Sequence, residues 1–448
     1  MLPILAVPQT VMKGLSSYRD IFCKDAGFES IGRYITGLIL SPNKTLQGIH
    51  GFQCYSGCSV SRRSMHEAVF ETNWDDEKLM VRHRQNLSLK YSSGKGKSAI
   101  SLDWTFGHHE SGKHIFGVKK QWDYVNNRYS FCQTIPTATI SNNTSFDPID
   151  IEIQEPKHLQ QEKKYLDATV KESYSSQEET REKLLQLLHY NKHQKEYKTI
   201  HELFVEMIDR IEEENQFPES DYAFDNGVLN LKTANTIEQY QKNWVSELEL
   251  SRNVLWNQKW TRVDQVAELL KKDHPNSFKK QKIRLRDGTT KEYLVFTKVL
   301  RLKKHWGRKR IAIVFEKEDL SDSPRVLISN ATHWNGVKIL KLWNYRWPCE
   351  IFHNFGKNIS GLENAQVRKK ESVKKQLRLA CLSQSILNQT EVHSSTREEF
   401  SFAKGAITIG QKVKSIAREV LESLVCFTKD MLDRNKNVTE ILNQLMPI

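Results

Sequence analysis

Three acidic residues in separate parts of the chain are candidates for a divalent-metal site. Asp103 lies in the apolar run SAISLDWTF, Asp225 ends the short apolar run DYAF, and Glu350 lies in WNYRWPCEIFHNFGK. Mg²⁺ prefers a few carboxylates together with water and substrate phosphate. Two such ions about 4 Å apart activate an attacking oxygen and stabilise a leaving oxygen. The three acids therefore predict phosphodiester cleavage and transfer with Mg²⁺, or Mn²⁺ in its place.

Two cations share the segment of the third acid. Arg346 and Lys357 stand four residues before and seven residues after Glu350, and on a helix these offsets fall on one face. A carboxylate between cations suits a site that holds a metal and a phosphate together. The alternative is an amphipathic helix whose charged face is simply solvated.

Pro348 bears on how this segment folds. Proline inside a helix removes a hydrogen bond, so the helix either kinks at Pro348 or begins near Trp347. A kink would take Trp343 and Arg346 off the face that carries Glu350.

The two aspartates have alternatives of their own. Asp103 could be a turn residue beside HHESGK, although its place inside an apolar strand favours a functional role. Asp225 has Asp209 and Asp221 as competitors for the second position, and FDNG is itself a turn signal.

Other metal ligands in the sequence are weaker candidates. His108 and His109 follow Asp103 closely, but the magnesium chemistry does not need them. The seven cysteines are dispersed, which suits a reducing compartment. A zinc site would have to use Cys54 and Cys58 with His50 and His66, and this spacing is not a common finger pattern.

Basic residues concentrate in one segment of a chain whose net charge is +13. Residues 271–310 hold fifteen lysines and arginines but only three acids. Such density neutralises phosphates and predicts nucleic-acid binding, with a solubilising surface loop as the alternative. Trp306 stands among the cations, where it could stack on a base. The predicted DNA contacts are Lys303, Lys304, Arg308, Lys309 and Arg310.

The pattern of apolar residues changes along the chain. Residues 1–90 show helical spacing, and the Ser, Gly and Lys of YSSGKGK form a linker composition. Strands are predicted at 98–106, 114–125 and 128–135, in a meander. Residues 136–180 are polar and show no clear structure.

The second half reads as an α/β unit followed by a basic β-rich insertion. Helices are predicted at 180–190 and 199–214, and then a strand, loop, helix and strand over 221–250. Asp225 would then lie at the carboxyl end of a strand, where ligand groups collect. Strand-like runs at 292–300, 310–316 and 325–330 precede the helix of Glu350 and two C-terminal helical segments.

No apolar run approaches the ~18 residues of a membrane span, and the start of the chain lacks a basic secretory leader. We therefore expect a cytoplasmic protein that does not enter the membrane.

At these residues the chain resembles DDE transposases of bacterial insertion sequences, in the branch with a Tyr, Arg, Glu, Lys signature. Arg346, Glu350 and Lys357 match the signature's spacings, and Trp343 stands where the signature has tyrosine. The segments GLENAQVRK and LDWTFGHHESGKHIFGVKKQWDYV also resemble the family, and YRDIFCKDAGFESIGRYITGLIL does so more loosely. The resemblance extends over about residues 15–380.

The resemblance implies an α/β protein with a ribonuclease-H-like mixed-sheet core, interrupted by a β-rich insertion and preceded by a helical domain. The expected divisions are a helical N-terminal DNA-binding domain (1–92), the first part of the core (93–245), the basic β-rich insertion (246–335), the last part of the core (336–390) and a C-terminal helical region (391–448).

The resemblance also implies an activity and its partners. The activity is cut-and-paste transposition, with Asp103, Asp225 and Glu350 as catalytic metal ligands. Arg346 and Lys357 would contact DNA phosphates, and Trp343 would stack on a base or pack in the core. The partners would be the terminal inverted repeats and the target, both double-stranded DNA, bound in the bacterial cytoplasm near the nucleoid by a homodimer that joins two ends.

Two other functions remain open on the sequence. One is an inactive or domesticated derivative that binds DNA without cutting it, although all three acids are present. The other is a ribonuclease-H-like DNA nuclease, which would not need a separate end-binding domain such as residues 1–92.

Overall fold

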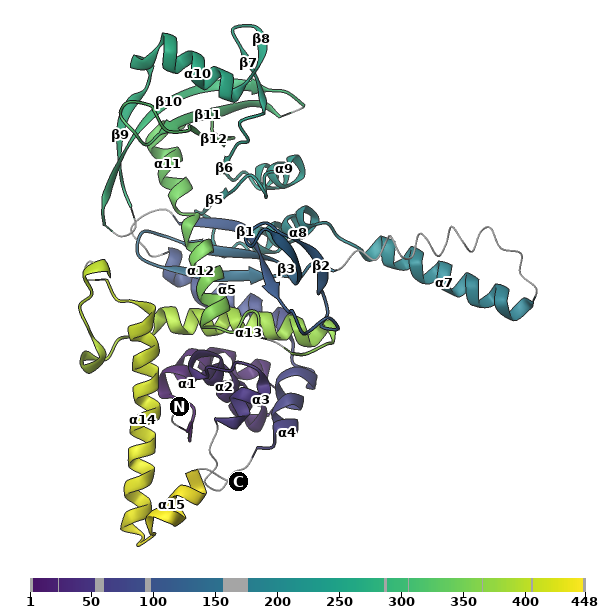
Figure 1. The fold of residues 1–448 in the computed structure, drawn as a ribbon, viewed down its shortest axis with the longest axis vertical. Coiled ribbons are helices and arrows are strands. Elements are labelled where there is room, and N and C mark those ends of the chain that lie inside the picture. Colours follow the sequence, from purple (N-terminus) through teal and green to yellow (C-terminus); the bar gives the residue numbers. More distant parts are fainter. Residues whose placement is uncertain are drawn as a thin grey trace.

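The computed structural model describes residues 3–22, 24–52, 60–92, 98–155, 176–285, 288–304, 306–364, 366–403 and 406–445. These residues form an elongated α/β molecule around one mixed sheet of twelve strands (Figure 1). The predicted α/β class is confirmed. Cys54 and Cys58, considered above as weaker zinc candidates, and residues 93–97 of the predicted linker lie outside the described residues.

The first part of the sheet is a meander. It consists of β1 (Ala99–His108), β2 (Lys119–Asp123), β3 (Arg128–Ser141) and β4 (Phe146–Ile151). β1 pairs antiparallel with the second part of β3, and β2 and β4 share the other edge of β3. The three predicted strands are confirmed.

The expectation that residues 136–180 lack clear structure is wrong where the structure describes them. β3 continues to Ser141, β4 follows, and α7 (Gln177–Glu196) begins before the segment ends. Many inward positions here are polar, among them Thr137, Asp147 and Asp150, and they are fully buried. Polar residues satisfied inside a protein leave no apolar alternation in the sequence, which is why pattern analysis missed the strands.

The second part of the sheet is parallel to β1. α8 (Ile200–Glu213) leads into β5 (Asp221–Phe224), and α9 (Leu231–Gln239) connects β5 to β6 (Trp244–Glu247). β5 pairs in parallel with both β1 and β6, as the predicted α/β unit requires. Tyr222 and Phe224 face the core beneath α8 and α9, whereas Ala223 faces a second core beneath α11. The alternation places helices on both faces of the sheet.

The insertion continues the same sheet. It contains β7 (Asn253–Trp256), β8 (Lys259–Arg262), α10 (Val263–Asp273), β9 (Lys279–Arg284), β10 (Thr290–Leu302), β11 (Gly307–Phe315) and β12 (Arg325–Ser329). β12 pairs with both β11 and β6, so the hydrogen-bonded ladder runs from the meander into the insertion. The predicted β-rich character is present, together with a helix, α10, that pattern analysis did not predict.

The other helices come from the parts of the chain before β1 and after β12. They are α1 (Gln9–Leu15), α2 (Asp25–Leu40), α3 (Leu46–Gly51), α4 (Arg62–His66), α5 (Asp76–Ser92), α11 (Gly336–Asn344), α12 (Trp347–Asn358), α13 (Lys370–Gln389), α14 (Ile409–Asp433) and α15 (Val438–Leu445). α13 lies between the sheet and the N-terminal helices (Figure 1). α2 and α3 approach closely at Gly37, where a Cβ atom would stand 2.3 Å from the side chain of Ile49. Within the described part of the chain, no helix is both long enough and apolar enough to cross a bilayer.

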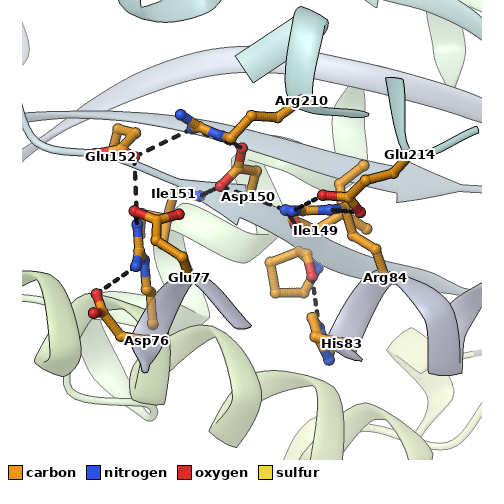
Figure 2. Close-up of polar contacts among 12 residues, drawn as sticks. Asp76, Glu77, His83, Arg84, Ile149, Asp150, Ile151, Glu152, Arg210 and Glu214 are labelled. Carbon is orange, nitrogen blue, oxygen red and sulfur yellow. Dashed lines mark hydrogen bonds and ion pairs between the residues drawn. The ribbon is translucent and has the colours of Figure 1, made fainter. Parts of the chain in front are cut away.

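A buried network of charges joins α5, α8 and α13 to β4 (Figure 2). Arg84 of α5 is 1% exposed, and its guanidinium nitrogens lie 2.5 Å from Glu214 and 3.8 Å from Asp150. Arg210 of α8 contacts Asp150 at 2.9 Å and Glu152 at 3.2 Å.

The same network continues into α13 through Arg378, which is also 1% exposed. Arg378 pairs with Asp76 and Glu77 of α5 and lies 3.4 Å from Glu152. Ions removed from water are stable only when each is paired and hydrogen-bonded, so the network fixes where these helices can lie.

We predict that Arg84→Ala lowers the free energy of unfolding by about 3–5 kcal/mol, because it removes the arginine that pairs with Glu214 and one of the two arginines beside the buried Asp150. The control is Arg63→Ala, which removes an exposed arginine paired with Glu67 and should cost no more than about 1 kcal/mol. Urea unfolding of both variants measures the difference, and equal losses would contradict the role of the network.

Candidate active site

The segment around Pro348 forms two helices rather than one. α11 ends at Asn344, and α12 begins at Trp347 with Pro348 in its first turn. A proline there needs no backbone hydrogen bond, because the first turn of a helix has no acceptor for its N–H groups. The helix therefore starts near Trp347 and does not kink at Pro348. Arg346 precedes this start directly and remains beside Glu350.

Three elements bring the acids together. Asp103 lies in the middle of β1, and Asp225 follows β5 directly. The parallel register pairs Leu102 with Phe224, so the two aspartates are the next residues along neighbouring strands. α12 packs on β1 and carries Glu350 in its first turn.

Arg346 offsets part of the negative charge of this cluster. Its guanidinium nitrogens lie 2.5 Å from Glu350 Oε1 and 3.8 Å from Asp103 Oδ2. The pKa of Asp103 is raised to about 7, chiefly by burial and then by the negative charges of Asp225 and Glu350. The Trp104 backbone N–H and Arg346 act in the opposite direction. The site therefore holds more negative charge than one arginine offsets.

Asp225 is the second acid that the geometry selects. Its Oδ1 accepts hydrogen bonds from the backbone N–H groups of Gly227 at 2.9 Å and Val228 at 3.3 Å, which orient the carboxylate. Its competitors are used elsewhere: Asp221 accepts from Asn243 at the start of β5, and Asp209 accepts from the Tyr240 hydroxyl.

Lys357 belongs to a second chain of charges beside the site. Its Nζ lies 3.0 Å from Glu363 Oε1, and the same oxygen lies 3.2 Å from His108 Nδ1. The other ring nitrogen of His108 lies 2.8 Å from Asp123. Sequence reasoning missed this pairing, although Glu363 stands in the GLENAQVRK segment that carries part of the resemblance. His109 instead contacts Gln133, at 3.1 Å.

Two tryptophans close to Glu350 in the sequence differ in their exposure to solvent. Trp343 is 6% exposed in the core beneath α11, with the Arg346 guanidinium 4.9 Å from its ring. This favours packing over stacking on a base. Trp347, which sequence reasoning passed over, is 59% exposed at the start of α12.

The predicted basic contacts divide into two groups. Lys303, Lys304 and Arg308 are exposed. Lys309 instead pairs with Glu238 at 2.8 Å, and Arg310 is half-buried. Trp306 is packed against Trp244 in the core, so the expectation that it stacks on a base is wrong in this structure.

The three acids fit a hard divalent cation by their chemistry. All are carboxylates, and the raised pKa of Asp103 shows that the site would gain from added positive charge. In the described residues no three His, Cys, Asp or Glu side chains already form a metal cluster. Arg346 instead bridges Asp103 and Glu350, so metal binding would require a local rearrangement of these side chains.

No protein-family model matches the chain, and no curated protein matches it.

We predict that Asp103→Asn stabilises the fold by roughly 2–4 kcal/mol at pH 8 and by much less at pH 5. The folded-state pKa of Asp103, about 7, exceeds the unfolded value near 4, so the wild type loses stability as pH rises through this window. Asparagine cannot ionise and avoids that loss. Urea unfolding at both pH values measures the difference, and an equal offset at each pH would contradict the raised pKa.

Proposed function

We propose that this protein is a DDE transposase that cuts DNA strands and joins them to a target, built on a ribonuclease-H-like core. The observation that carries the proposal is the meeting of Asp103, Asp225 and Glu350, from β1, β5 and α12, around Arg346. The order of meander, α/β unit, β insertion and helix agrees with the fold that the resemblance implies.

The residues of the site have distinct roles in this proposal. Asp103, Asp225 and Glu350 would hold Mg²⁺, which when bound neutralises phosphate charge and lowers the pKa of an attacking oxygen. Arg346 would bind a DNA phosphate in place of its carboxylate partner, because a guanidinium binds both anions through the same fork of donors. Asp225, held by two backbone N–H groups, keeps its carboxylate oriented without help from the metal.

Lys357 would act from the other end of α12. It lies one helix length from Arg346 and is held by Glu363, so it is positioned rather than mobile. Trp347 is the exposed aromatic side chain nearest to Arg346 in sequence, and it supports base contact at this end of the site better than the buried Trp343 does.

The basic face of the insertion supports DNA as the substrate. Lys303, Lys304 and Arg308 are exposed near the β10–β11 turn, and Arg301 and Arg308 line a hollow of about 450 Å³ with Trp256 and Lys298. The Lys298 ammonium lies 4.4 Å from the Trp256 ring centre. Cations beside an aromatic ring favour nucleic acid over an acidic protein.

We predict that Asp225→Asn and Glu350→Gln each reduce strand cleavage by the order of 10³-fold, because metal activation supplies several kcal/mol of the barrier reduction. The assay is excision of a marked mini-element bearing the DNA that flanks the gene, with nicking of the element ends as a second readout. Asp221→Asn is the matched control, four residues earlier at the start of β5, and should retain activity.

The outcomes separate the alternatives. Nicking without rejoining would favour the ribonuclease-H-like nuclease, and binding without nicking would favour the inactive DNA-binding derivative. Nicking by Glu350→Gln at the wild-type rate would remove Glu350 from the catalytic set.

We predict that replacing Lys303, Lys304 and Arg308 together with alanine makes DNA binding less dependent on salt. The plot of the logarithm of the binding constant against the logarithm of the salt concentration has a negative slope, and its magnitude should fall by about 2–3, since each phosphate contact contributes about 0.9. The control replaces Lys280 and Lys291, which are already paired with Glu292, Glu318 and Glu316 and should change the slope less. Filter binding of duplex DNA over a range of salt measures both. A slope equal to that of the wild type would exclude this turn as a DNA contact.

A further inference from the structure

The hairpin of β2 and β3 presents aromatic rings to solvent. Trp122 is 39% exposed, Tyr124 is 71% exposed and Tyr129 is 66% exposed. The rings of Trp122 and Tyr129 meet edge to face across the hairpin, with centroids 5.3 Å apart and an interplanar angle of 77°. Adjacent exposed rings on one turn mark an interaction site more often than single exposed apolar residues do.

Cations lie on the hairpin and on the loop before it. The Lys120 ammonium lies 5.9 Å from the Tyr129 ring centre, and the Lys113 ammonium lies 4.7 Å from that of Phe131. Arg128, at the start of β3, is exposed and contacts Glu110 at 3.0 Å. Rings interleaved with positive charge complement a strand whose bases stack and whose phosphates are negative.

The turn of the hairpin is held in one conformation. Asp123 is fully buried, and its Oδ1 accepts from the backbone N–H groups of Val125 at 2.9 Å and Asn126 at 3.2 Å. Its Oδ2 accepts from the Asn126 side chain at 2.7 Å. Asn127 takes the left-handed conformation that closes the turn, with φ of 50°. The rings are therefore presented by a rigid support, which lowers the entropy lost on binding.

The hairpin is also linked to the candidate active site. Asp123 contacts His108, His108 contacts Glu363, and Glu363 pairs with Lys357 of α12. β3 runs from the hairpin to Thr137, which pairs with Asp103. Thr137 follows Arg128 by nine positions along β3, which corresponds to about 30 Å.

We propose that the β2–β3 hairpin binds unpaired bases of a nucleic-acid strand by stacking them on Trp122, Tyr124 and Tyr129. Lys113, Lys120 and Arg128 contact the phosphates of that strand. The inference rests on the proposed function for the origin of the strand, which would be a strand released when DNA is opened near the carboxylates. The binding itself does not require cleavage.

The experiment measures fluorescence anisotropy of a labelled oligothymidylate of about 15 nucleotides and of a duplex of equal length, in EDTA so that no cleavage occurs. The double variant Trp122→Ala with Tyr129→Ala should bind the single strand about tenfold more weakly or worse. Its affinity for the duplex should change by less than about twofold, because stacked bases in a duplex are not available to the rings. Val125→Ala is the matched control, since Val125 is 82% exposed on the same turn but carries no ring.

Trp122→Phe and Tyr129→Phe keep a ring at each position and should restore single-strand binding. Wild-type affinity in the alanine double variant would overturn the proposal. A second result would also overturn it: the variant loses self-association, measured by sedimentation, but keeps single-strand binding. The hairpin would then be a protein interface. The binding assay is run without metal, so it does not depend on cleavage. Loss of nicking in Glu350→Gln tests the proposed function, and loss of single-strand binding in the hairpin variant tests this inference.

Discussion

The buried arginine network fixes the relation between the sheet and the helices that carry the site. Arg84, Arg210 and Arg378 come from α5, α8 and α13, and all three meet the acids of β4 and its end. A helix that moved would leave charges unpaired away from water, which costs far more than a displaced apolar contact. α12 is tied in turn, because it leads into α13 and packs on β1. The position of Glu350 thus depends on charges that take no part in the chemistry.

The candidate active site has fewer cations for its acids than the network has. The network sets three arginines against five acids, whereas Asp103, Asp225 and Glu350 share the single guanidinium of Arg346. Burial and, after it, the negative charge of Asp225 raise the pKa of Asp103 to about 7. A carboxyl group whose pKa is raised by burial and by a neighbouring acid is a candidate functional group, and a bound cation would stabilise its charged form.

The sequence predicted the elements that carry Asp103, Asp225 and Glu350 better than it predicted the elements around them. The offsets of Arg346 and Glu350 hold because both lie at the start of one helix, and Pro348 marked where that helix begins. β1 and the α/β unit were found because their inward residues are apolar. β4 was missed because two of its buried residues, Asp147 and Asp150, are acids whose partners lie far away in the chain.

Exposure was the other quantity that the sequence did not reveal. Trp306 and Trp343 stand among cations in the sequence, yet both pack inside the protein, and Lys309 lies against Glu238. The orientation of a single side chain depends on tertiary packing, which local composition does not record. For the same reason the pairing of His108, Glu363 and Lys357, which joins segments about 250 residues apart, could be found only in the fold.

The ladder between β6 and β12 has a consequence for how this molecule could be altered. In a protein whose insertion is a separate module, the module can be cut out or exchanged at its two linkers. Here such an excision would strip β6 of its neighbour and leave a row of bare backbone N–H and C=O groups two strands from Asp103. An uncovered sheet edge recruits other chains. A shortened version would therefore need a new edge strand or a cap, and a hybrid would have to be joined within the sheet rather than at its loops.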